Sequence, residues 1–164
     1  MARDKALPQN VYVAVVDMLR AAIDGCTDAN CFFCLDPDAI PPSPGELIYV
    51  VSPTSGTFDE GMMDGGGVQQ LTVEAGVLVK IHSPLMLDQV GNDTSLLNDE
   101  SLGLWGKATE VLAALAIQSP TVAGNAQTRD PLMPHSFSIT KSHKRLGAIE
   151  MTFKVLFDWD VSSA

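Results

Sequence analysis

The sequence predicts an α+β fold, in which a mostly antiparallel β-sheet carries two α-helices packed on one face and is joined by long loops. Two segments have apolar residues at helical spacing, and four others are short apolar runs or alternate apolar with polar residues. The predicted order is helix, strand, strand, helix, strand, strand. With 164 residues, 46% of them hydrophobic, the chain is expected to form one domain over residues 1–164.

The first predicted element is a helix in the segment PQNVYVAVVDMLRAAIDG. Val11, Val15 and Leu19 recur at helical spacing and form its apolar face. Asn10 is a candidate N-cap, and Gly25 is a candidate stop signal. One face of this helix is therefore expected to pack on the sheet.

Three cysteines follow the helix, with the spacing C-x4-C-x2-C: Cys26, Cys31 and Cys34. A closed zinc site needs four ligands, usually from two such pairs, and the second pair is missing. A redox pair would open a helix, whereas this one follows a helix. We therefore expect buried thiols that anchor a loop beside Phe32 and Phe33, with a metal site on the three cysteines as the alternative.

Apolar and alternating stretches predict the strands. LIYVVS at 47–52 reads as a buried strand, and VQQLTVEAGVLVKIHS alternates with a two-residue period as one long, bent strand. The segment FSITKSHKRLGAIEMTFKVLFDWD predicts a closing β-hairpin with its turn around 144–147. Proline, glycine and polar residues predict long loops at about 26–46, 53–67 and 118–136.

A second helix is predicted in NDESLGLWGKATEVLAALAIQ, between the long strand and the hairpin. Asn98 is its candidate N-cap, with acidic residues in the first turn. Its predicted stripe is formed by Leu102, Trp105, Thr109, Leu112 and Leu115 or Ala116. This stripe is expected to face the sheet.

The charge of the chain is strongly negative, with a net value of −10 from 20 acidic and 10 basic residues. Between Ala21 and Gly106 there are thirteen carboxylates, and Lys80 is the one lysine or arginine. A protein that grips a nucleic-acid backbone needs the opposite sign over a broad face. Specific binding of nucleic acid is therefore not expected.

Other classes of function also find little support. The N-terminal residues MARDKALPQN are polar, unlike a signal peptide, and the sequence contains no apolar run of about 20 residues, so we expect a protein made in the cytoplasm and not inserted in a membrane. No G-x-S-x-G motif is present, and the glycines at 65–67 lack the Lys-Ser/Thr of a phosphate-binding loop. Neither an enzyme nor a cofactor is expected.

The predicted loop at 53–67 contains FDEGMMDGGG, in which large apolar residues stand among acids and glycines. Such a loop either folds back onto the sheet or packs against another chain. On the second interpretation, its candidate interface residues are Phe58, Asp59, Glu60, Met62, Met63 and Asp64.

The layout of these elements resembles that of the tail-terminator and neck proteins of long-tailed bacteriophages. The resemblance covers nearly the whole chain. It rests on the order of VYVAVVDMLRAAI, LIYVVS, the acidic loop, VQQLTVEAGVLVKIHS, WGKATEVLAALAI and the closing hairpin.

The resemblance implies a structural virion protein, assembled in the host cytoplasm, that forms a homohexameric ring. Such a ring caps the tail tube, contacts the tail-tube protein and the head connector or adaptor proteins, and lets DNA pass through its lumen. Acidic residues around the lumen would repel the phosphate backbone. Ring contacts are heterologous, so the acidic middle of the chain is expected to meet the basic cluster Lys141, Lys144 and Arg145 of a neighbour. Another neck component, such as a head-completion or adaptor protein, is an alternative, as is a small metal-binding protein or enzyme built on the cysteines.

Overall fold

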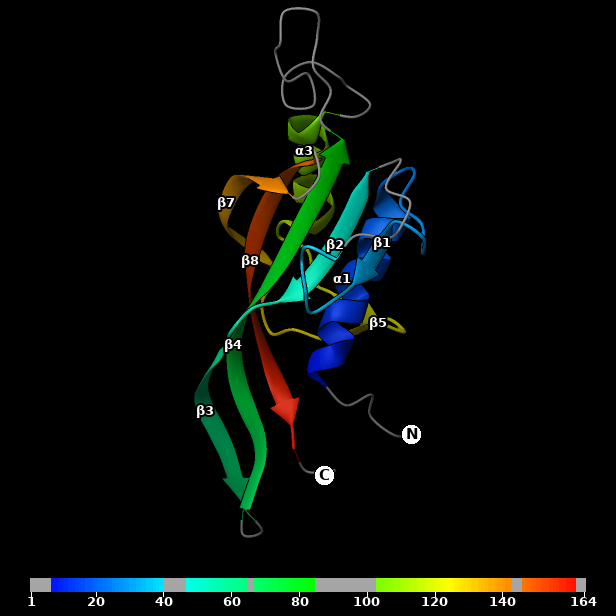
Figure 1. The fold of residues 1–164 in the computed structure, drawn as a ribbon. Coiled ribbons are helices and arrows are strands. Elements are labelled where there is room, and N and C mark those ends of the chain that lie inside the picture. The colour runs from blue at the N-terminus through cyan, green and yellow to red at the C-terminus, as the bar shows by residue number, and fades with distance from the viewer. Residues whose placement is uncertain (1–6, 40–46, 65–66, 85–102, 143–145, 162–164) are drawn as a thin grey trace, which may run out of the picture.

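The computed structural model describes residues 7–39, 47–64, 67–84, 103–142 and 146–161. It confirms the α+β fold, because helices pack on a mostly antiparallel sheet (Figure 1). The elements are α1 (Pro8–Ala22), β1 (Cys31–Phe33), β2 (Ile48–Pro53), β3 (Thr57–Asp64), β4 (Gly67–Pro84), α3 (Leu104–Leu115), β5 (Thr121–Val122), β6 (Asn125–Ala126), β7 (Met133–Ser142) and β8 (Leu146–Asp160).

The main sheet has the strand order β1-β2-β4-β8-β7, and β3 pairs with β4 off this path. Only the pairing of β1 with β2 is parallel among the described strands. The two long strands β4 and β8 pair from Gln70–Asp160 at one end to Pro84–Leu146 at the other. The predicted long strand and the predicted closing hairpin are both confirmed, although the turn at 143–145 lies outside the described residues.

Strand β4 pairs with β8 along one edge, and along its other edge it pairs with two different strands in turn. Its C-terminal half pairs with β2, whereas residues 67–74 pair with β3. We call β3 and residues 67–74 of β4 the arm, and the rest of the sheet with its helices the body. In Figure 1 the arm extends away from the body, with the end of β8 beside it.

The hydrophobic core lies mainly in the body, between the helices and one face of the sheet, and it extends to Val73 at the root of the arm. Helix α1 buries Val11, Val15 and Leu19, as its spacing predicted. Helix α3 buries Leu104, Ala108, Val111 and Leu115, which follow helical spacing. The predicted stripe of this second helix was therefore correct for Leu115 but wrong for Trp105 and Leu112, which are 44% and 37% exposed. Leu102 lies outside the described residues.

The helix ends also differ from the prediction. Helix α1 begins after Leu7, and Pro8 occupies the first turn, where its missing N–H costs no hydrogen bond, so Asn10 is not the cap. The helix ends at Ala22, and Gly25 follows in a turn with φ +86°. Helix α3 has Gly103 at its N-cap, and the predicted cap, Asn98, lies outside the described residues.

The prediction of an irregular loop at 53–67 was wrong, because most of this segment is strand β3. Strand β4 extends past the end of β2 and offers a free edge, with which the acidic, glycine-rich segment pairs. Two register shifts, between Phe58 and Gly61 and between Met62 and Met63, interrupt the pairing. The other two predicted loops were too long, since the first contains β1, and the second contains β5, β6 and the start of β7.

Candidate assembly surfaces

The arm carries every candidate interface residue that the sequence placed between positions 58 and 64. Phe58 is 63% exposed, and its ring lies 6.1 Å from that of Trp159 on β8, centroid to centroid. Asp59 is exposed as well. Glu60, Met62, Met63 and Asp64 lie in the same strand, but their side chains are outside the described part. The arm therefore presents an apolar ring and a carboxylate to solvent.

Polar contacts fix the root of the arm to the body. Thr72 Oγ1 donates a hydrogen bond of 3.1 Å to Asp158 on β8. The other oxygen of that carboxylate accepts a bond of 2.8 Å from Arg129 Nε. Gly76 lies where β4 leaves β3, and a Cβ there would collide with the Thr54 side chain. The direction of the arm is thus set by contacts at its base.

One basic candidate residue, Lys141, lies at the opposite end of the sheet. Lys141 lies in β7, which pairs with β8 next to the turn, while Lys144 and Arg145 lie outside the described residues. Strand β8 has 15 residues, so at about 3.3 Å per residue it separates the two ends by up to about 50 Å. The fold therefore does not bring Lys141 and the acidic candidates of β3 together within one chain.

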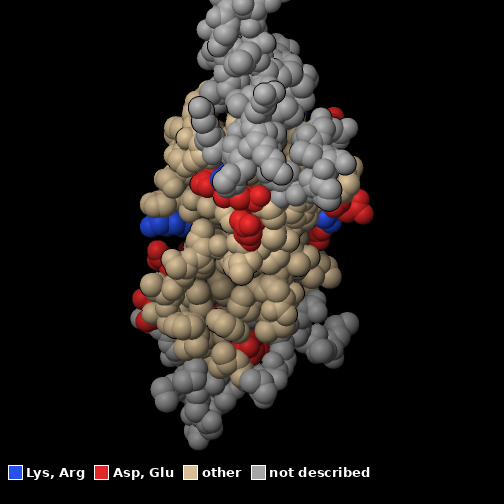
Figure 2. All heavy atoms as spheres, in the orientation of Figure 1, with Lys and Arg blue, Asp and Glu red and all other residues tan. Residues whose placement is uncertain are grey.

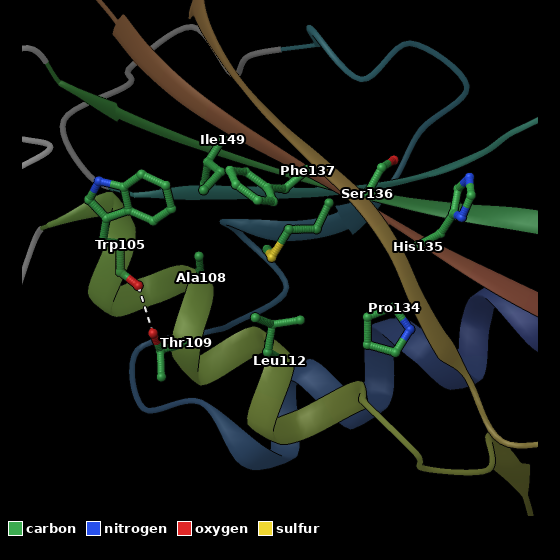
Figure 3. A pocket seen from close by; sticks show the side chains of 10 residues that line it. Trp105, Ala108, Thr109, Leu112, Pro134, His135, Ser136, Phe137 and Ile149 are labelled. Carbon is green, nitrogen blue, oxygen red and sulfur yellow. Dashed lines mark hydrogen bonds between the residues drawn. The ribbon is translucent and has the colours of Figure 1, made fainter.

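An apolar groove between α3 and β7 was missed by the sequence reasoning. It has a volume of about 270 Å³, and Ile149 and Met151 of β8 belong to its lining. Figure 3 shows Trp105 and Leu112 of α3 facing it across from Phe137 of β7. The rings of Trp105 and Phe137 meet edge to face, with their centroids 5.7 Å apart.

The groove exists because β7 extends the sheet beyond the cover of the helices. Phe137 pairs with Met151, and Ile139 pairs with Ile149, so these β7 residues lie in register with core residues. Phe137 nevertheless remains 62% exposed, and Ile139 is exposed too. The apolar face of the sheet thus continues onto β7, but Phe137 and Ile139 are not covered as their partners on β8 are. An apolar surface of this kind is typical of a binding site for another chain.

The cysteine segment pins the end of α1 to the edge of the sheet. Cys26 and Cys31 are buried, and the interaction of the two thiols lowers the pKa of Cys31 and, together with burial, raises the pKa of Cys26. Arg20 donates two hydrogen bonds, of 3.0 and 2.6 Å, to the carbonyl oxygen of Cys31. The expected anchoring is confirmed for these two thiols, while Cys34 is only half-buried and Phe33 is exposed.

No metal-binding group of three or more His, Cys, Asp or Glu side chains is found among the described residues. Ser52 Oγ donates a hydrogen bond of 2.6 Å to the carbonyl oxygen of Cys34. The backbone N–H of Cys34 donates one of 2.9 Å to the carbonyl oxygen of Val51. These bonds attach the segment after β1 to strand β2. In the described part, the segment thus has the contacts of a structural anchor.

A buried cation holds the segment at 36–39 against the sheet. Lys80 is 4% exposed, and its Nζ lies 2.7 Å from Asp38 and 3.2 Å from Glu150. Burial disfavours its charge, but the two carboxylates outweigh burial and raise the pKa of Lys80. His82 is fully buried, with Nε2 2.9 Å from the carbonyl oxygen of Pro37, and burial lowers its pKa. Both residues stabilise the fold.

Charged groups are sparse on the face seen in Figure 2. Most of this face is formed by uncharged residues, with acidic groups in small clusters and fewer basic groups. No described helix is long and apolar enough to cross a membrane. The exposed arm and the apolar groove are thus the two described surfaces that suit contacts between proteins.

The α+β fold of this chain is similar to the folds of two solved structures. The chain is similar to a chain in the virion of a native gene transfer agent particle, with 15% identity over 90% of this chain and 94% of that chain and a TM-score of 0.54. It is also similar to the sheath/tube terminator of PVC, an extracellular contractile injection system, in its extended state.

That second likeness has 12% identity over 97% of this chain and 58% of that chain, with a TM-score of 0.50. At these identities the similarity concerns the fold. No protein-family model and no curated protein sequence matches the chain. The fold implied by the resemblance to tail terminators is thus confirmed from the structural side.

Proposed function

We propose that this chain is a structural, non-enzymatic protein of a phage neck, which ends the tail as a ring and joins it to the head connector. The observation that carries the proposal is the likeness to a sheath/tube terminator over 97% of the chain. The arm and the groove support it, because they are two different apolar surfaces on one subunit. Heterologous contacts between unlike surfaces produce rings when the rotation closes.

The proposed ring is a homohexamer whose lumen admits DNA without binding it. A net charge of −10 on each chain supports this property, since each copy adds to a negative field that repels phosphates. The proposed partners are further copies of the chain, the tail-tube protein and the head connector or adaptor proteins. The proposed location is the neck of the virion, after assembly in the host cytoplasm.

Labelling of intact particles tests this function. A short peptide tag on the chain, detected with gold-conjugated antibody, should appear where the tail meets the head. Particles made without the chain should accumulate separate heads and tails, because nothing ends the tube and joins it to the head. A label at the far end of the tail, or along its shaft, would contradict the proposal.

The alternative is a head-completion or adaptor protein of the same neck. The likeness to a virion chain of the gene transfer agent agrees with this alternative, because that description does not specify a position in the particle. The same experiment separates the two proteins. Without a head-completion protein, tails of normal length should form beside heads that have lost their DNA.

A further inference from the structure

Two long strands have an outer edge that no described strand covers. Strand β7 ends the main path of the sheet, and β3 pairs with β4 alone. The edge at β1 is different, because this strand has three residues and its Cys31 carbonyl already accepts both hydrogen bonds from Arg20. Long, uncapped edges can add a strand from another chain.

The two free edges complement each other in charge. Strand β7 has the sequence MPHSFSITKS, with Lys141 and no carboxylate. Strand β3 has the sequence TFDEGMMD, with three carboxylates and no lysine or arginine. Pairing β3 with β3, or β7 with β7, would bring like charges together, whereas pairing β3 with β7 opposes unlike charges.

The two edges also complement each other in apolar surface. The groove of Trp105, Leu112 and Phe137 lies directly beside β7 and has room for a large side chain. Strand β3 carries Phe58, whose ring stays mostly exposed although it touches Trp159. An added strand at β7 would place its alternate side chains over this groove.

We propose that β3 of one copy pairs with the edge of β7 in a second copy of this chain, and that Phe58 enters the groove there. The proposal deepens the proposed function and rests on it, because it assigns the two faces of the ring contact. Each copy then supplies one arm and one groove, so contacts pass from subunit to subunit. The contact also explains why Lys141 and the acidic candidates of β3 lie at opposite ends of the sheet.

Complementing variants test this contact. Phe58→Asp removes the arm contact, and Phe137→Asp removes the groove contact. Both side chains are exposed to the same degree in the subunit, so each variant should keep the fold, as checked by thermal unfolding. Each alone should assemble at least about 30-fold more weakly than the unchanged protein, the size of effect expected of a hot-spot residue.

A mixture of the two variants gives the sharpest outcome. The intact arm of Phe137→Asp can still meet the intact groove of Phe58→Asp, so sedimentation should show one-to-one dimers and no rings. Leu35→Asp is the matched control, since Leu35 is even more exposed but lies just beyond β1. This control should assemble like the unchanged protein.

A charge exchange gives a second, independent readout. Asp59→Lys and Lys141→Glu should each weaken assembly, and the two changes together should restore it. If either aspartate variant lowers thermal stability, the milder Phe58→Ser and Phe137→Ser replace the pair. Both sets of variants are compared at the same chain concentrations and ionic strength.

The proposal is overturned if the Phe variants assemble normally, if their mixture gives no dimer, or if Leu35→Asp blocks assembly equally. It is also overturned if the unchanged chain stays monomeric at every concentration. These outcomes differ from failure of the proposed function. A label at the head–tail junction beside normal assembly of the Phe variants would keep the neck role and reject only this contact.

Discussion

The body and the arm are built from the same two long strands, yet they differ in what covers those strands. In the body, Val77, Val79 and Ile81 of β4 have no exposed surface. Towards the tip of the arm, Gln70 and Leu71 of the same strand are half-buried. The helices stop short of the arm, where β4 lies between β3 and the end of β8 (Figure 1). The comparison teaches that folding depends on the body, which leaves the arm free to contact other chains.

The largest expected effect on folding comes from the centre of the body. Phe153 of β8 is fully buried against the helices. Phe153→Ala should lower the free energy of unfolding by about 3–5 kcal/mol, since it removes a large side chain and leaves a cavity. Urea unfolding of the single chain measures this change. A loss below about 1 kcal/mol would contradict the assignment of Phe153 to the core.

The buried cation gives the next largest effect. Lys80→Met should cost about 2–3 kcal/mol, because it leaves Asp38 and Glu150 close together without their cation, although both are partly exposed. Lys154→Met is the matched control, since Lys154 and Glu74 form an exposed pair 3.8 Å apart. The control should change stability by less than about 0.5 kcal/mol. Equal effects of the two substitutions would show that burial of Lys80 has no consequence.

The joint between body and arm gives an effect of intermediate size. Gly76→Ala should destabilise the chain by about 1–3 kcal/mol, because the new methyl group collides with the side chain of Thr54. The double variant Gly76→Ala, Thr54→Ala lacks the colliding Thr54 side chain, so it should regain most of the lost stability. Thermal unfolding of both single variants and the double variant measures this coupling. Additive effects in the double variant would exclude the collision.

Acidification should destabilise the body through His82. Burial lowers the pKa of His82 below its ordinary value of 6.5, so at acidic pH the unfolded chain binds a proton that the folded chain resists. The contribution of neutral His82 to stability is complete above about pH 6.5, and it is lost as the pH falls towards the lower pKa that His82 has in the folded chain. The free energy of unfolding should fall by up to about 1.4 kcal/mol per pH unit in this window.

Replacement of the histidine provides the comparison for this pH effect. His82→Gln keeps a side-chain N–H that can reach the Pro37 carbonyl, but it does not titrate. The slope between pH 6.5 and pH 5.5 should therefore flatten in this variant. A slope that persists in His82→Gln would assign the effect to other groups.

The smallest expected effect on folding lies in the arm. Phe58→Ala should change the free energy of unfolding of the single chain by less than about 1 kcal/mol, since its ring is mostly exposed and touches Trp159 at one side. The same change should weaken assembly strongly if the proposed contact is correct. A loss of stability comparable to that of Phe153→Ala would place the arm in the folding core and remove the contrast between the two regions.

Sequence patterns predicted the elements whose burial is decided locally. The alternation in Val77, Val79 and Ile81 identified β4, and the spacing of Val11, Val15 and Leu19 identified α1. The arm could not be predicted in this way, because β3 consists of acids, methionines and a glycine that are typical of loops. Its pairing depends on the extension of β4 beyond the end of β2, which is a property of the whole sheet.

The groove was missed for a related reason. The sequence shows that Trp105 and Leu112 are apolar, but their exposure depends on how α3 is rotated and on how far β7 extends beyond it. One signal was present: Leu104, Ala108, Val111 and Leu115 already complete the buried face of α3. Trp105 and Leu112 are therefore additional apolar residues, which a second contact surface would explain. The interface residues of β3 and the basic cluster remain predictions.

Amide hydrogen exchange, measured on the free chain and on the assembled protein, tests most directly whether the arm and the groove edge serve assembly. In the free chain, the amides at the tip of β3 should exchange quickly, while those of β2 and the body half of β4 stay protected. On assembly, protection should rise in β3 and in β7 together and remain unchanged at β1. Unchanged exchange in β3 and β7, or new protection confined to β1, would contradict the account.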